Sequence, residues 1–292
     1  MPPRTLTIVV VLLVLFGSIS PLGAQNNTSP CTAEQHQQLI DTFNLVQADI
    51  DKVINVPEPE EMEMGDLYIM ILSVDWLLDN YRGTFHDQMP ECADALFIGE
   101  SLGLVYDSFI QVVILTTLSL RALDAGNVDA GDQLIDAAGL RNDYTQTLPE
   151  LPEIFPQLEQ GNMFPDGLPV CGAAAGDVLI QYETPFQSYL SILPEYEHFI
   201  ETGSGDFDTL LQFETLSLET LQMDTEVCAE SYYFEVLYNR LFMDTSIVIH
   251  VLQLAALEER FGEATNAELY HSIAEERKAS VEELLPMFMP PE

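Results

Sequence analysis

The stretch CADALFIGESLGLVYDSFIQVVILTTLSLRALDAG, residues 92–126, determines the fold expected for this chain. Its apolar residues surround the axis of the predicted helix, and no charged residue occurs between Asp107 and Arg121. A helix that is apolar all round is buried in a bundle or spans a membrane. The 13 uncharged residues are fewer than the roughly 20 that a span needs, so the sequence predicts the central helix of a bundle.

A second stretch, residues 228–262, has the same plan and reads CAESYYFEVLYNRLFMDTSIVIHVLQLAALEERFG. Each stretch opens with Cys-Ala and an acid and ends at a glycine 34 residues after the cysteine, where a helix C-cap glycine is expected. Only five positions are identical, so the two stretches resemble each other mainly in the spacing of their cysteines and glycines. A cysteine precedes each stretch by a similar interval: Cys31 by 61 residues and Cys171 by 57. The sequence predicts an internal duplication.

Further helices are expected around these two. A capping box of Thr32 and Gln35 opens the first helix. Apolar residues at intervals of three and four predict the others, over residues 60–81, 127–148, 173–200, 208–223 and 265–285. Pro185 and Pro194 are expected to kink or split the helix that contains them. The predicted fold is all-α: two tandem four-helix units, 31–148 and 171–286, joined by a proline-rich linker over 149–170.

The four cysteines predict two disulfides if the chain is exported. In an up-down-up-down bundle, the first and third helices begin at the same end. Cys31 and Cys171 precede the first helix of each unit, and Cys92 and Cys228 open the third. We therefore expect the bonds Cys31–Cys92 and Cys171–Cys228, one in each unit.

The N-terminus resembles a secretory signal. Arg4 precedes an apolar run from Leu6 to Phe16, and small residues follow up to Ala24, so residues 1–24 are expected to be a signal peptide. The expected location is secreted or extracytoplasmic; an uncleaved anchor is the alternative for this segment. No later segment is expected to be long and uncharged enough to span a membrane.

The chain is extremely acidic, with 48 Asp and Glu against 9 Lys and Arg, a net charge of −39. Phosphate repulsion argues against nucleic acid and anionic membranes as partners. Diffuse cations, including divalent ones, are compatible with this charge. The hydrophobic content of 47% argues for a folded chain, because disordered chains lack such residues.

Two motifs suggest chemistry. Residues 99–103 read GESLG, which matches the G-x-S-x-G nucleophile elbow of serine hydrolases and would make Ser101 the nucleophile. The flanks predict one continuous helix, whereas the elbow needs a strand before it, so two glycines at a close helix contact are the preferred interpretation.

Two Glu-x-x-His pairs occur, Glu195 with His198 and Glu268 with His271. Di-iron carboxylate bundles use such pairs on two of their helices. Here the pairs fall on the first and fourth helices of the second unit, whereas ferritin-like proteins carry them on the second and fourth. These four residues are the metal-ligand candidates that we retain, and two exposed histidines among acids is the simpler interpretation.

Arginines recur at matching places. Arg121 and Arg260 fall near the ends of the two central helices, and Arg141 and Arg277 are separated by 136 residues, the spacing that also separates Cys92 from Cys228. We interpret them as structural ion pairs within each half. The sequence predicts no cofactor and assigns no enzymatic activity. The favoured function is an exported acidic binding, scaffold or surface-associated protein whose partner is an unidentified protein or small ligand. A metal-binding carboxylate bundle (a di-metal oxidase or storage protein) and a serine hydrolase are the alternatives.

Overall fold

The computed structural model describes residues 29–53, 90, 92–147, 158–170, 174–221 and 228–288. All regular secondary structure in these ranges is helical, which confirms the all-α prediction. The helices are α2 (Ala33–Val53), α4 (Ala93–Asp124), α5 (Val128–Thr147), α7 (Ala174–Thr202), α8 (Phe207–Leu221), α9 (Ala229–Phe261) and α10 (Ala264–Phe288). The predicted signal peptide and the predicted helix over 60–81 lie outside the described residues.

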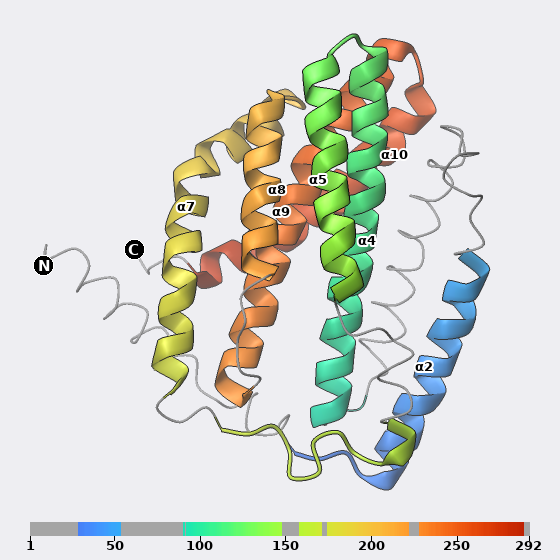
Figure 1. Cartoon of the computed structure of the whole chain (residues 1–292), viewed down its shortest axis with the longest axis vertical. Coiled ribbons are helices and arrows are strands. Elements are labelled where there is room, and N and C mark those ends of the chain that lie inside the picture. The colour runs from blue at the N-terminus through green and yellow to red at the C-terminus, as the bar shows by residue number, and fades with distance from the viewer. Residues whose placement is uncertain are drawn as a thin grey trace, which may run out of the picture.

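Two antiparallel helix pairs, α4 with α5 and α9 with α10, form the centre of the molecule (Figure 1). Both turns are closed by a left-handed glycine, Gly126 with a φ of 81° and Gly262 with a φ of 83°. The amide of Asn127 donates to the carbonyl of Ala122, and that of Glu263 to the carbonyl of Glu258, both at 2.9 Å. This is the hydrogen-bond pattern of a helix ended by glycine. The predicted C-cap glycines are confirmed.

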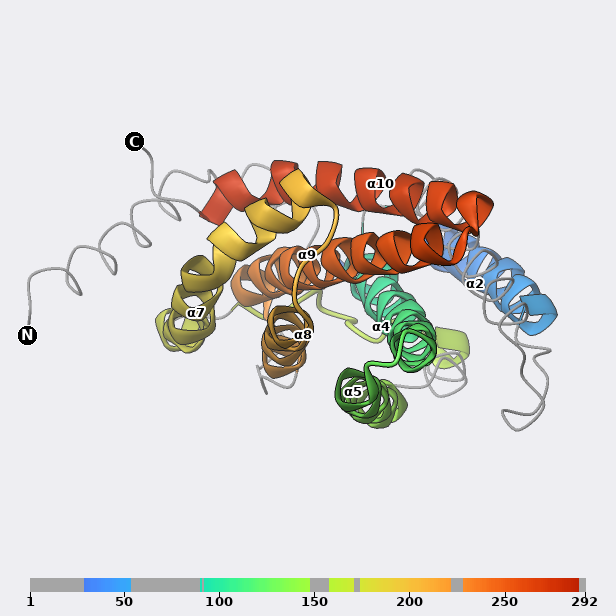
Figure 2. The same ribbon diagram turned by 90° about the horizontal axis from the view of Figure 1, so that it is seen from above.

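Helix α9 is the core helix of the protein. Every residue from Leu241 to Ala255 is buried, and Figure 2 shows α9 between α10 on one side and α4 and α8 on the other. By length and composition, α4 and the segment Leu237–Phe261 could each cross a membrane, contrary to the sequence-based expectation. In α9, however, 94% of the apolar window is buried inside the protein. Burial of this kind is typical of a core helix.

A disulfide joins the starts of α2 and α4. Cys31 and Cys92 are bonded, with their Cα atoms 4.9 Å apart, as predicted. Next to them, the buried carboxylate of Asp94 accepts hydrogen bonds from the amides of Met163 and Phe164 at 2.9 and 3.0 Å. Part of the predicted linker, residues 158–170, is therefore fixed against the beginning of α4.

The second predicted disulfide falls partly outside the described residues. Cys228 is buried at the start of α9, and none of the cysteines that the structure describes is free. Cys171 is not described, so the bond Cys171–Cys228 stays a prediction.

Helix α7 contains two prolines and still continues as one helix through Pro185 and Pro194. The last turns bend away from the lower part of the helix (Figure 1), as expected where proline removes a backbone hydrogen bond. A tight turn follows, in which a Cβ atom on Gly205 would lie 2.3 Å from the ring of Phe199. The close approach of this ring explains why glycine stands at that position.

One hydrophobic core joins the two halves of the chain. It extends from Leu39 on α2 to Phe288 on α10 without interruption. Around the lower part of α9, Tyr238 and Phe242 have ring centroids 4.7 Å apart, and Tyr189 of α7 lies 4.8 Å from Phe242. The domain boundaries expected from the sequence stay predictions, and among the described residues one core includes side chains from both halves.

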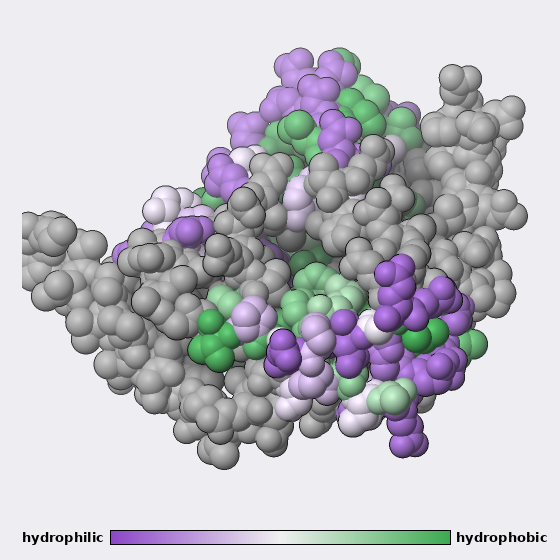
Figure 3. Space-filling model, turned by 60° about the horizontal axis from the view of Figure 1, so that its bottom comes forward, coloured by the Kyte–Doolittle hydropathy of each residue, from purple (hydrophilic) through white to green (hydrophobic). Residues whose placement is uncertain are grey.

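Large hydrophobic side chains are exposed at scattered positions. Examples are Leu45 on α2, Leu140 on α5 and Val170 in the loop before α7. In the view of Figure 3, hydrophobic residues appear in small groups between hydrophilic ones. Single exposed hydrophobic residues are common in folded proteins, so they do not distinguish a docking face.

Candidate functional site

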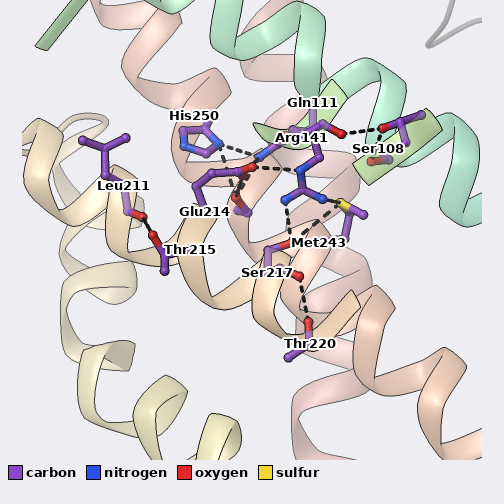
Figure 4. Close-up of polar contacts among 12 residues, drawn as sticks. Ser108, Gln111, Arg141, Leu211, Glu214, Thr215, Ser217, Thr220, Met243 and His250 are labelled. Carbon is purple, nitrogen blue, oxygen red and sulfur yellow. Dashed lines mark hydrogen bonds and ion pairs between the residues drawn. The ribbon is translucent and has the colours of Figure 1, made fainter. Parts of the chain in front are cut away.

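The core contains a polar network where α4, α5, α8 and α9 meet (Figure 4). The side chains are buried, and they come from helices that lie far apart in the sequence. The members are Gln111 on α4, Arg141 on α5, Glu214 and Ser217 on α8, and Met243, Ser246 and His250 on α9. Polar groups in a core need partners, because an unpaired one costs roughly 1–3 kcal/mol.

Arg141 and Glu214 form the charged part of this network. The guanidinium Nε donates to Glu214 Oε1 at 2.8 Å and Nη2 donates to Ser217 Oγ at 2.9 Å, while Nη1 lies 3.2 Å from Met243 Sδ. Burial alone would raise the pKa of Glu214, but the charge and hydrogen bond of Arg141 outweigh it and hold that pKa below its usual value. The pair therefore stays ionised inside the core.

His250 lies at the other end of the network. The Nε2 atom of Gln111 is 2.7 Å from His250 Nδ1, and it also donates to Glu214 Oε2 at 2.9 Å. Burial lowers the pKa of His250 to about 4, although the negative charge of Glu214 opposes this shift. The imidazole is therefore neutral near pH 7, with Nδ1 as an acceptor for the amide of Gln111.

Ser246, His250 and Glu214 are residue types of a catalytic triad, but their arrangement differs from one. In a triad the serine contacts one nitrogen of the histidine, and the acid contacts the other. Here Ser246 Oγ lies 3.3 Å from His250 Nδ1 and 3.2 Å from Glu214 Oε2, so the acid contacts the serine instead. All three residues are at most 1% exposed, so a substrate cannot reach them. We therefore interpret these contacts as a structural network that connects α4, α5, α8 and α9.

A second buried ion-pair cluster lies between α4, α9 and α10. Arg277 Nη1 is 2.9 Å from Asp244 Oδ1 and 3.1 Å from Asp107 Oδ1. Arg240 Nε lies 3.5 Å from Asp244 Oδ2 at the edge of this cluster. Arg277 of α10 thus forms ion pairs with carboxylates of both α4 and α9.

Near the upper turns, Arg121 of α4 pairs with Glu258 of α9. Nε and Nη2 contact the two carboxylate oxygens, the second at 2.9 Å, and the guanidinium lies 5.1 Å from the ring centre of Phe261. The Arg121–Glu258 pair connects the two halves of the chain, and so do the contacts of Arg141 with Glu214 and of Arg277 with Asp107. The prediction of ion pairs within each half is wrong for Arg141, whereas Arg121 and Arg277 also pair within their own halves, with Asp124 at 3.6 Å and with Asp244 at 2.9 Å. Arg260 is exposed.

Ser101 lies in the interior of α4, with helix on both sides. The strand, turn and helix of a nucleophile elbow are therefore not found there. The alternative of a close helix contact is not found at Gly103 either, because a Cβ atom there would meet nothing within 4 Å.

The metal-ligand candidates are placed on two surface helices. Glu195 and His198 are exposed on α7, Glu268 is exposed on α10, and His271 Nε2 lies 3.3 Å from the carboxylate of Glu259. Within the described part of the chain, no three His, Cys, Asp or Glu side chains are grouped so as to hold a metal ion. The two Glu-x-x-His pairs are thus not brought together.

An open groove lies between α5, α7 and α8, with a volume of about 490 Å³. Its walls combine hydroxyls, amides, carboxylates and aliphatic side chains, and none of the buried network residues lines it. The lining residues are Gln133, Ser188, Ser191, Ile192, Asp208, Leu211, Gln212, Thr215, Leu216 and Glu219. This volume is within the range of small-molecule sites.

The comparisons with known proteins were negative. No protein-family model matches this chain. No curated protein and no solved structure matches it either.

Sequence reasoning missed both the buried network and the groove. The signal for the network was present: Gln111 and His250 each have apolar residues directly before and after them in a helix predicted to be buried, and a polar residue in such a place needs a buried partner. Glu214 gave no comparable signal, because acids are frequent along this chain. The groove depends on how α7 and α8 lie beside α5, which no local pattern encodes.

Proposed function

We propose that this chain is an exported acidic helical protein that acts by binding, as a scaffold or surface-associated module, and has no enzymatic activity. The observation that carries the proposal is that the buried polar groups are bonded to one another and not exposed to a substrate. His250, Glu214 and Arg141, which have the chemistry for acid–base catalysis, are enclosed and hydrogen-bonded to one another or to neighbouring helices. They stabilise the arrangement of the helices, while the groove between α5, α7 and α8 is accessible to a ligand.

Export is part of the proposal. The apolar N-terminal segment with Ala24 as the expected cleavage site and the disulfide Cys31–Cys92 support it, because disulfides persist in oxidising compartments. N-terminal sequencing of protein recovered from the extracytoplasmic fraction of the expressing cells should begin at Gln25.

The internal duplication is also a proposal, and one reciprocal contact supports it. Arg141 contacts Met243, and Arg277 contacts Asp107. Adding 136 to the numbers of Arg141 and Asp107 gives Arg277 and Met243, so the first contact maps onto the second with the halves exchanged. A pseudo-twofold relation between α4–α5 and α9–α10 would produce this exchange.

Two measurements test the absence of enzymatic activity. The purified mature chain should contain no stoichiometric transition metal, and a fluorophosphonate probe should label it no more than the variant Ser101→Ala. Stoichiometric iron or manganese that is lost in His198→Ala and His271→Ala would establish the metal-binding alternative instead. Probe labelling that Ser101→Ala abolishes would establish the hydrolase alternative.

A further inference from the structure

Three features of the groove between α5, α7 and α8 point to one class of ligand. They are the charge of its walls, the hydrogen-bonding state of two of its hydroxyls, and the spacing of its carboxylates along an aliphatic floor.

The helices that form the groove contain a single basic residue, Arg141, which is fully buried and neutralised by Glu214. The carboxylates of Asp208 and Glu219 line the groove and are exposed. A cleft lined by charges of one sign concentrates the field and attracts ligands of the opposite sign. The groove therefore favours a cation.

Two hydroxyls and one amide of the groove donate hydrogens inside the protein. Thr215 Oγ1 donates to the carbonyl of Leu211 at 2.8 Å, a bond that Figure 4 draws, and Ser191 Oγ donates to the carbonyl of Ser188 at 2.6 Å. Gln133 donates an amide hydrogen to the carbonyl of Asp129 at 3.2 Å. Both hydroxyls are left with lone pairs only, so they can accept hydrogen bonds from a ligand but cannot donate. An ammonium group, which only donates, is a suitable partner for these two hydroxyls.

The carboxylates stand at the two ends of one helical stripe. Asp208, Leu211, Thr215 and Glu219 follow one another on α8 at intervals of three or four residues, so they share one face. At 1.5 Å per residue, Asp208 and Glu219 are about 16 Å apart along the axis. Between them, Leu211 and the neighbouring Ile192 and Leu216 supply an aliphatic floor.

We propose that this groove binds a linear aliphatic polyamine, with a terminal ammonium group at each of Asp208 and Glu219 and the methylene chain over Leu211 and Ile192. The proposal rests on the binding function argued above and specifies its ligand. Hydroxyl and amide oxygens between the two ends accept hydrogen bonds from the internal amino groups. Because the carboxylates are exposed, binding should weaken as salt increases.

Isothermal titration of the mature chain with spermine tests the proposal. The double variant Asp208→Asn/Glu219→Gln should weaken binding about tenfold, since it removes two exposed ion pairs. The matched control Glu263→Gln/Glu268→Gln removes the same charge near the start of α10, away from α7 and α8 (Figure 2), and should change the affinity less than about twofold. Equal weakening in both double variants would mean diffuse attraction and would overturn the proposal.

A series of α,ω-diamines tests the spacing. Dodecane-diamine, whose amino groups are about 16 Å apart when extended, should bind more tightly than octane-diamine or butane-diamine, because only the longest reaches both carboxylates. Affinity that does not depend on chain length, or no binding of spermine at all, would overturn the polyamine assignment. Such a result would leave the metal-content and probe-labelling tests unaffected, so failure of this inference can be told from failure of the proposed function.

Discussion

The buried neutral histidine makes the folded protein sensitive to acid. In the unfolded chain His250 has the ordinary pKa of 6.5, whereas in the fold burial lowers its pKa to about 4. Above pH 6.5 both states hold a neutral imidazole, so this residue adds no pH dependence. As the pH falls from 6.5 toward 4, only the unfolded state takes up the proton, and the folded state is progressively disfavoured. The full shift corresponds to about 3 kcal/mol of unfolding free energy.

The experiment compares urea unfolding of the mature chain at pH 7.5 and pH 5. Relative to pH 7.5, protonation of His250 in the unfolded chain should lower the unfolding free energy at pH 5 by about 2 kcal/mol. His250→Asn keeps an oxygen near the position of Nδ1 that can accept from Gln111, and it should lower stability at pH 7.5 but remove this part of the pH dependence. His271→Asn, at an exposed histidine, serves as the control and should keep the pH dependence of the unchanged chain.

Other groups also contribute to the pH dependence of stability, but the carboxyl groups are the same in all three proteins. The informative quantity is therefore the difference between the pH profile of His250→Asn and those of the other two. Parallel profiles for all three would refute the reasoning, because they would mean that His250 takes up its proton in the folded state as easily as in the unfolded chain.

Three further predictions concern stability. Arg121→Met should destabilise the fold by about 3 kcal/mol in urea unfolding, because it leaves the buried Glu258 without its cation. Adding Glu258→Leu to this variant should restore stability if the two residues are paired, and additive losses would contradict the pairing. Replacing both Cys31 and Cys92 by serine should lower the unfolding free energy by about 4 kcal/mol, and non-reducing peptide mapping should recover this bond. Moderate NaCl should raise the melting temperature by screening the net charge of −39, and Ca²⁺ should do so at lower concentration; a melting temperature independent of salt would contradict this account.

Local features were predictable because their causes are local. The apolar stretch from Asp107 to Arg121 specified a buried helix, and the glycines at 126 and 262 specified where the two central helices end. The capping box was also found as predicted: Thr32 and Gln35 exchange hydrogen bonds at 3.0 and 3.3 Å. In each case the residues that interact lie within a few turns of one another.

The packing between the halves was not predictable in the same way. The stripe pattern of a helix specifies which face is buried, but not which helix covers it. For this reason the sequence suggested two separate units, whereas Glu214 on α8 contacts Arg141 on α5, and Glu258 on α9 contacts Arg121 on α4. Such pairs connect residues that are 73 and 137 positions apart. A long-range pair of this kind leaves no periodic trace in a single sequence.

The distribution of arginines relates the acidic composition to the proposed ligand. Among the arginines in the described helices, Arg141 and Arg277 are fully buried and Arg121 is mostly buried, whereas Arg240 is partly exposed and Arg260 is exposed. Because the bonds between helices occupy Arg121, Arg141 and Arg277, these cations mainly neutralise carboxylates of the core, although Arg121 also lies 3.6 Å from the exposed Asp124. In the described helices most exposed charges are therefore negative, and we expect free cations to gather around them diffusely. A polyamine must therefore be distinguished from this general attraction by the length of its chain, which matches the separation of two carboxylates on α8, and not by its charge.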